Sequence, residues 1–100
     1  MKKNNKEVIP VIGIAWYRAD QWERLHQVSI DRENLHEKYE DWVKDTTELI
    51  KNYKEHGIEL KKVKVNVEKI LKWCRNKNIP VDSHARSEYV ADKLRRKSEK

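Results

Sequence analysis

The sequence predicts an α+β domain with a minimal parallel sheet of about two strands and about four helices, in the order β-α-α-β-α-α. Three observations predict it: an apolar, β-branched run at 8–17, a long amphipathic stretch at 32–56, and a second short apolar run at 58–65 that precedes two further amphipathic stretches. The chain has 100 residues, 37% of them hydrophobic, which suffices for a single core. Because about forty residues of helical character separate the two strands, we expect the strands to lie parallel.

The first strand is predicted at 8–17, where apolar residues occupy both parities. A strand of this kind is typically covered on both faces. Gly13 and Ala15 share one face, and their small size would let a helix approach closely. Pro10, which lacks an N–H group, is expected near the start of the strand or on an edge.

The residues before this strand are polar and aperiodic, and we expect 1–7 to be a disordered lead-in. A single α+β domain is then predicted to span 8–96, and the chain to end in a frayed, charged tail at 97–100. The whole sequence contains 2 glycines and 2 prolines, a composition that argues against a linker within the domain.

The first two helices are predicted from capping and periodicity. Asp20 and Glu23 have the spacing of a capping box and would open a short helix with Trp22 on its apolar face. Apolar residues at alternating steps of three and four predict a long helix over 32–56, ~37 Å in length at 1.5 Å per residue. Gly57 stands where a left-handed residue would end this helix.

The second strand, predicted at 58–65, leads into the last two helices. Asn66 is expected to cap a third helix that ends near Asn78, just ahead of an Ile-Pro pair that cannot continue it. Either Asp82 or Ser83 would cap the fourth helix.

A first strand that is apolar on both faces makes a poor exposed edge, because unpaired strand edges recruit other chains. In a two-stranded sheet each strand has one neighbour, so we expect the first strand to complete its pairing in a homo-oligomer or with a protein partner. Aromatic and arginine side chains dominate the energetics of interfaces. The partly exposed anchors expected for this interface are Trp16, Tyr17, Arg18 and Trp22.

These features predict a non-enzymatic protein-interaction or regulatory module that self-associates. The alternative is a nucleic-acid-binding accessory protein that uses the basic C-terminal half. The net charge is +6, but 21–57 carries six Lys/Arg against nine Asp/Glu, whereas 58–100 carries thirteen against six. A lysine-rich solvated surface is the simpler explanation of the basic residues. The candidate basic patch consists of Lys62, Lys64, Lys69, Lys72, Arg75 and Arg86.

A small-ligand site is a third possibility. In parallel α/β arrangements, ligands bind outside the C-terminal ends of the strands. That rim would hold Asp20 and Asn66, although both residues are explained more simply as helix caps.

The sequence shows no pattern of metal ligands, cofactor loop or catalytic nucleophile, and we expect no metal, no cofactor and no enzymatic activity. The four histidines lack ligand spacing, and two glycines cannot build a phosphate-binding loop. Cys74 falls on the apolar face of the third predicted helix, where a buried and unreactive thiol is expected.

The longest apolar stretch, at 8–17, is too short to cross a bilayer, which takes ~20 residues. A single cysteine cannot form an intrachain disulfide, so nothing indicates an oxidising compartment. We therefore expect a cytoplasmic protein that makes no contact with a membrane.

Several short motifs are spread along most of the chain after the lead-in. They are Ile14-Ala-Trp-Tyr-Arg18, Trp22, Tyr39-Glu-Asp-Trp42, Trp73-Cys74, Ile79-Pro-Val-Asp82 and Ala85-Arg86. In these motifs the chain resembles small stand-alone bacterial proteins of unknown function. The resemblance implies a compact, single-domain cytoplasmic protein and transfers no catalytic residue.

Overall fold

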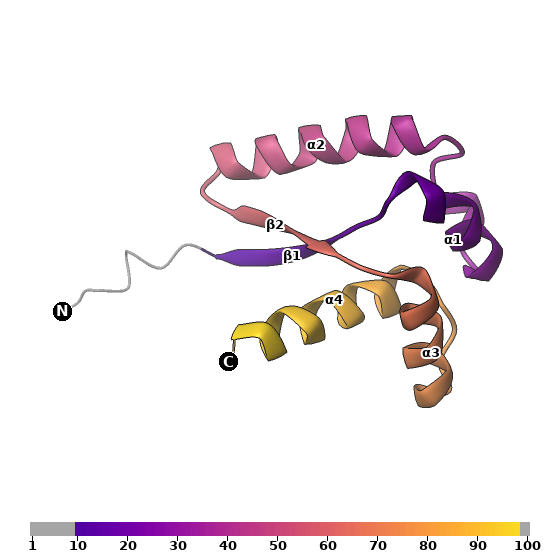
Figure 1. Cartoon of the computed structure of the whole chain (residues 1–100). Coiled ribbons are helices and arrows are strands. Elements are labelled where there is room, and N and C mark those ends of the chain that lie inside the picture. The colour runs from indigo at the N-terminus through magenta and orange to yellow at the C-terminus, as the bar shows by residue number, and fades with distance from the viewer. Residues whose placement is uncertain (1–9, 99–100) are drawn as a thin grey trace.

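A computed structural model of the chain describes residues 10–98, and it confirms the predicted α+β class and the order β-α-α-β-α-α (Figure 1). Two single-turn 3-10 helices accompany the predicted elements, one on each side of the first α-helix. The elements are β1 (Val11–Trp16), η2 (Ala19–Gln21), α1 (Trp22–Val28), η3 (Arg32–Asn34), α2 (Tyr39–Glu55), β2 (Glu59–Lys64), α3 (Val67–Lys77) and α4 (Ser83–Ser98).

β1 and β2 form a two-stranded parallel sheet, as predicted. Their register is continuous from the pair Val11–Glu59 to the pair Trp16–Lys64. At the start of the ladder the N–H group of Glu59 donates to the Pro10 carbonyl (3.0 Å), so the proline lies immediately before the strand, where its missing N–H costs nothing.

The sheet lies between two helices, α2 on one face and α4 on the other (Figure 1). On the α4 face, a Cβ atom added to Gly13 would lie 2.8 Å from Val90 Cγ1 and 3.2 Å from Leu94 Cδ2. The glycine therefore permits the close helix approach that its position in the strand predicted. On the α2 face, the ring centroids of Trp16 and Trp42 are 4.8 Å apart.

One hydrophobic core joins the sheet to α1, α3 and α4. Its largest fully buried side chains include Leu25, Ile70, Val67 and Val90, each with less than 2% of its surface exposed. Cys74 belongs to the same cluster, in agreement with the expected buried thiol, and burial raises its pKa.

Four predicted helix ends are confirmed by backbone or side-chain geometry. Gly57 follows α2 with a φ of 84°, and Asn78 ends α3 in the left-handed region with a φ of 58°. Asn66 Oδ1 accepts a hydrogen bond from the Lys69 N–H group (3.2 Å) at the start of α3. At the start of α4, Asp82 Oδ1 accepts from the Ala85 N–H group (2.9 Å).

The predicted capping box at Asp20 is wrong. Asp20 lies within the 3-10 turn η2, and α1 begins at Trp22 with no side-chain cap. The Asp20 carboxylate is instead held by the guanidinium group of Arg18, at 3.0 and 3.2 Å. An acid two residues from an arginine therefore forms a local ion pair in place of the expected cap.

The predicted start of the long helix is also wrong: α2 begins at Tyr39 and spans 17 residues, ~26 Å. The His36 carbonyl, which a helix would use internally, accepts a hydrogen bond from Trp22 Nε1 (3.1 Å) and lies 2.9 Å from His26 Nε2. Arg32 Nε donates back to the Ser29 carbonyl (3.1 Å). These contacts hold the preceding segment in a non-helical path.

The predicted lead-in at 1–7 lies outside the described residues. Residues 97 and 98, expected in the frayed tail, are the last two of α4, and 99–100 lie outside the description. Within residues 10–98, no helix is long and apolar enough to cross a bilayer.

Candidate functional site

The outer edge of β1 is the feature of the fold that most requires an explanation. In a parallel pair of strands, every second residue directs both its N–H and its C=O group toward the neighbouring strand, and the residues between direct theirs away from it. Because the Pro10 and Trp16 carbonyls accept bonds from the β2 strand and its extension, the even-numbered residues of β1 face β2. The N–H and C=O groups of Val11, Gly13 and Ala15 therefore point outward. Within residues 10–98 no third strand pairs with them.

A groove of about 260 Å³ follows this edge between the two helix layers. Its floor is the strand itself, one wall comes from the aromatic residues around α2, and the other comes from the first half of α4. Its lining residues are Gly13, Ile14, Ala15, Tyr17, Trp22, Leu35, Trp42, Ser83, Arg86, Ser87 and Val90. The groove therefore gives access to the unpaired backbone of β1.

The edge is closed where β1 ends. The Tyr39 hydroxyl group donates a hydrogen bond to the Tyr17 carbonyl (2.7 Å), so an incoming strand could not use that acceptor. Tyr17 itself is buried, and burial raises the pKa of its phenol to about 12. The open part of the edge thus comprises the three outward-facing residues of β1.

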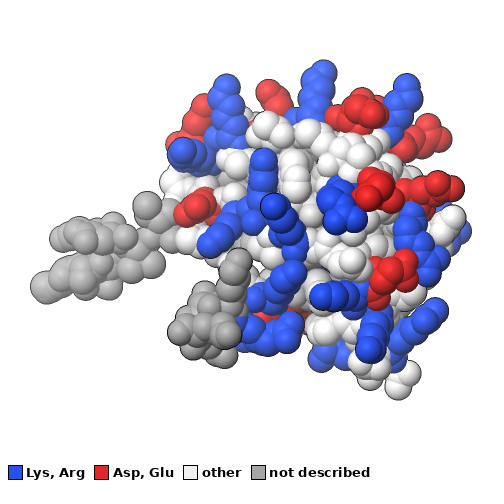
Figure 2. All heavy atoms as spheres, viewed as in Figure 1, with Lys and Arg blue, Asp and Glu red and all other residues white. Residues whose placement is uncertain are grey.

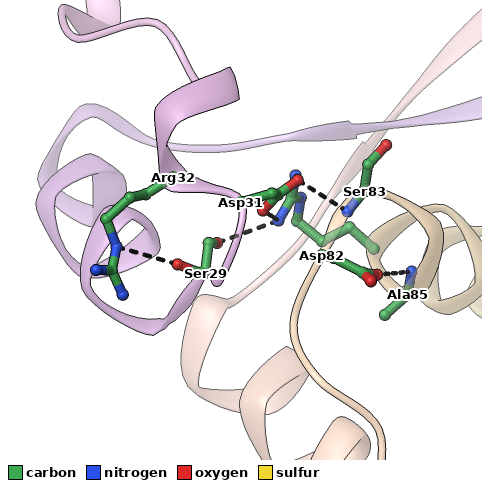
Figure 3. Close-up of polar contacts among 7 residues, drawn as sticks. Ser29, Asp31, Arg32, Asp82, Ser83 and Ala85 are labelled. Carbon is green, nitrogen blue, oxygen red and sulfur yellow. Dashed lines mark hydrogen bonds and ion pairs between the residues drawn. The ribbon is translucent and has the colours of Figure 1, made fainter.

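A buried ion pair supports the α4 wall of the groove. The Arg86 guanidinium binds both carboxylate oxygens of Asp31, at 3.0 and 2.9 Å, and donates to Ser29 Oγ at 3.1 Å. The same carboxylate accepts from the Ser83 N–H group, so the loop after α1 holds the start of α4 in place (Figure 3).

The outer edge of β2 differs from that of β1 in its charge. β2 carries Lys61, Lys62 and Lys64, and Lys93 Nζ donates to the outward carbonyl of Lys64 (2.8 Å). Lysines on an edge strand discourage pairing with other chains. β1, with the sequence VIGIAW, has no charged residue. One edge of the sheet is therefore protected and the other is not.

Apolar side chains are exposed at the start of β1 and on α2. Val11 and Ile12 are 47% and 49% exposed, so the predicted cover of this strand is incomplete at its start. On α2, Leu49 and Tyr53 are 42% and 39% exposed and follow Trp42 at helical spacing on one face. Burying these side chains against a partner would be favourable.

The structure corrects the expected aromatic anchors. Tyr17 and Trp22 are 5% and 6% exposed and belong to the core, so they are not the partly exposed contacts that we predicted. Their rings pack together with a centroid distance of 6.0 Å. Trp16 is half-buried between Trp42 and Lys62, and Arg18 is exposed.

Asp20 and Asn66 are not joined by any hydrogen bond or ion pair in the described residues: Asp20 binds Arg18, and Asn66 caps α3. Nearby, Gln21 Oε1 is buried without a hydrogen-bond partner in the described part of the chain. The predicted rim therefore holds two polar side chains that are each engaged locally and one buried oxygen without a partner among the described residues.

Arg86 does not belong to the predicted basic patch, because it is buried against Asp31. The other predicted members are exposed, and they divide between two elements. Lys62 and Lys64 lie on β2, and Lys69, Lys72 and Arg75 lie on α3. The two lysines of β2 share a groove with Lys61 and Lys93.

Two residues of the site were missed from the sequence. The spacing of Tyr39 fits the apolar face of a helix, and nothing in the sequence pairs it with Tyr17. Asp31 lies between the first two predicted helices. An acid in such a break is compatible with a distant arginine, but the sequence does not say which one.

Residues 10–98 contain no group of three or more His, Cys, Asp or Glu side chains that could hold a metal ion. His36 Nε2 lies 2.8 Å from Asp45 Oδ2, and His84 lies 3.4 Å from Glu88, both as exposed side-chain pairs.

No protein-family model, curated protein sequence or solved structure matches this chain.

Proposed function

We propose that this protein is a non-enzymatic interaction module that self-associates by pairing β1 with β1 of a second copy. The observation that carries the proposal is the contrast between the two sheet edges. The outer edge of β1 is uncharged and open along a groove, whereas that of β2 carries three lysines. An unprotected edge in a sheet whose other edge is protected indicates a strand that is used for pairing.

The outward N–H and C=O groups of β1 are spaced so that two copies of the strand can pair antiparallel about a two-fold axis. If Gly13 faces its own copy across the symmetry axis, Val11 of each chain faces Ala15 of the other. All three outward-facing residues then exchange both of their backbone hydrogen bonds with the opposite strand, as the hydrogen-bonded pairs of an antiparallel ladder do. The interface is isologous and closes on itself, which limits the assembly to a dimer.

The same pairing would cover exposed apolar surface. The two sheets would join into one four-stranded sheet, with the α2 helices side by side on one face and the α4 helices on the other. Val11 and Ile12 lie on the joined strands, and their exposed surface would lose contact with water. No charged side chain of β1 would have to be buried.

The oligomeric state tests the proposal directly. Sedimentation velocity over a hundredfold range of concentration is expected to show a monomer–dimer equilibrium for the wild-type chain. Val11→Lys places on β1 the type of charge that protects β2, and we expect it to shift the equilibrium to the monomer. Ile30→Lys is the matched control, because Ile30 is 60% exposed and lies outside β1. A wild-type chain that stays monomeric throughout would contradict the proposal.

Amide hydrogen exchange locates the interface without a substitution. The N–H groups of Ile12 and Ile14 are paired within the sheet and should be protected at every concentration. Those of Gly13 and Ala15 should become protected only as the dimer forms. If the chain dimerises while these two amides keep exchanging rapidly, association uses another surface.

A further inference from the structure

The outer edge of β2 forms a second groove, of about 370 Å³, that is distinct from the groove along β1. It is lined by Lys61, Lys62, Val63, Lys64, Lys93 and Leu94. Four of its six lining residues are therefore lysines, and none is acidic. In Figure 2, basic side chains gather over the middle of the face on which β2 and α4 lie, and most acidic ones lie toward its margins.

The four lysines of this groove are not neutralised by the described part of the chain. The ion pairs among the described residues join arginines and histidines to carboxylates, and none includes a lysine of the groove. Asp92, which is adjacent to Lys93 in sequence, pairs with Arg95 and Arg96. The groove thus keeps its positive charges available for a ligand.

Two of the lysines are held in place by uncharged contacts. Lys62 Nζ lies 4.1 Å from the centroid of the Trp16 ring, a cation–π contact that orients the ammonium group without cancelling its charge. Lys93 Nζ donates to the Lys64 carbonyl at 2.8 Å. The groove therefore presents a partly ordered set of charges along the strand.

The Lys93 contact also limits how a ligand can bind. By occupying the outward carbonyl of Lys64, it removes an acceptor that an added peptide strand would need. The lining also lacks an arginine, the side chain suited to two-pronged binding of a carboxylate. Lysine acts on phosphate as a point charge, which does not require such geometry.

From this geometry we infer that the β2 groove binds the phosphate backbone of a nucleic acid. Its lysines contact phosphates, and no Asn, Gln or Arg lines the groove to read base edges, so binding is independent of sequence. The inference does not depend on dimer formation, because the groove lies on the opposite edge of the sheet from the open edge of β1.

Fluorescence anisotropy with a fluorescein-labelled 20-base-pair duplex tests the inference. We expect the wild-type chain to bind at low salt, with an affinity that falls steeply as salt rises. The triple variant Lys61→Gln/Lys62→Gln/Lys64→Gln should bind at least about tenfold more weakly, and its log–log salt slope should be smaller by about 3.

The matched control is Lys38→Gln/Lys44→Gln/Lys51→Gln, which removes the same charge from exposed positions at and along α2. We expect it to keep most of the wild-type affinity and slope. An equal loss in both triple variants would show that overall charge alone attracts the duplex, and the inference would fail.

Two further measurements complete the test. Poly-L-glutamate at the same charge concentration should compete weakly with the duplex; competition as strong as that of unlabelled duplex would assign the groove to acidic proteins instead. The Val11→Lys variant should retain binding. Failure of the duplex to bind at low salt would overturn the inference while leaving the β1 dimer unaffected.

Discussion

Arg86 and Asp31, 55 residues apart in the chain, form a two-pronged ion pair with N–O distances of 3.0 and 2.9 Å. The two side chains are 11% and 15% exposed. Next to them, the Ile30 N–H group donates to the Val81 carbonyl (2.9 Å). The loop after α1 is thus tied to the start of α4, and this tie holds one wall of the β1 groove in position.

Replacing Arg86 with Met should destabilise the protein by about 3 kcal/mol, because it leaves the largely buried carboxylate of Asp31 without its cation. Urea unfolding followed by circular dichroism measures this loss. Arg18→Met is the control, since the Arg18–Asp20 pair is exposed to solvent and should contribute little to stability. Similar losses in the two variants would contradict a structural role for the buried pair.

The same ion pair predicts how stability depends on acid. The hydrogen bonds from Arg86 hold the pKa of Asp31 below its ordinary value of 3.8. A carboxyl group whose pKa is lowered by folding contributes stability above its unfolded pKa. That contribution is lost as the pH falls from about 4 through the folded pKa.

Urea midpoints measured between pH 7 and pH 2.5 should therefore fall more steeply for the wild type than for Asp31→Asn. At neutral pH the variant is expected to be the less stable of the two, and the gap should narrow below about pH 4. A constant gap over this range would show that the charge of Asp31 does not contribute.

Much of the fold could be predicted because its signals are local. Gly57 and Asn66 act within one turn of their own helix ends, β1 is a continuous apolar run, and the apolar residues of α2 recur with a period of 3.6. The true start of α2 could not be predicted. It depends on Trp22 Nε1 reaching the His36 carbonyl, a contact between segments 14 residues apart.

In the candidate site, too, some features have a local sequence signal and others depend on distant contacts. The open edge of β1 follows from an apolar strand in a sheet too small to flank it, which composition and spacing reveal. The burial of Trp22 and Arg86 does not, because it depends on which distant side chains surround them. An exposed and a buried tryptophan look alike in sequence, and so do a solvated and a paired arginine.

Substitution of Gly13 by Ala tests the close approach of α4 to the sheet. The added methyl group would lie 2.8 Å from Val90 Cγ1 and 3.3 Å from Val63 Cγ2, so the surrounding side chains or the helix must shift, at a cost of about 1–3 kcal/mol. Adding Val90→Ala should recover part of that loss beyond what the two single changes predict.

Gly57→Ala provides the contrast for this double-mutant cycle. Gly57 has a φ of 84° and nothing within 4 Å of an added Cβ, so its cost comes from backbone strain alone. Val90→Ala should not relieve it. Strict additivity of Gly13→Ala and Val90→Ala would refute the packing explanation.

The end of α3 gives the last prediction. Asn78 has φ 58° and ψ 42°, and the N–H group that follows it, that of Ile79, donates to the Cys74 carbonyl (3.0 Å). An alanine at 78 should cost about 1–2 kcal/mol, because its Cβ disfavours the left-handed region, whereas a glycine should change stability by less than about 0.5 kcal/mol.

Asn76→Ala is the control: it makes the same chemical change inside the helix at an exposed position, where alanine is the better helix former, so it should stabilise the protein slightly. Thermal unfolding measures all three, with about 4–8 °C expected per kcal/mol in a domain of this size. Equal melting temperatures for the alanine and glycine variants at 78 would mean that the left-handed conformation does not determine how this helix ends.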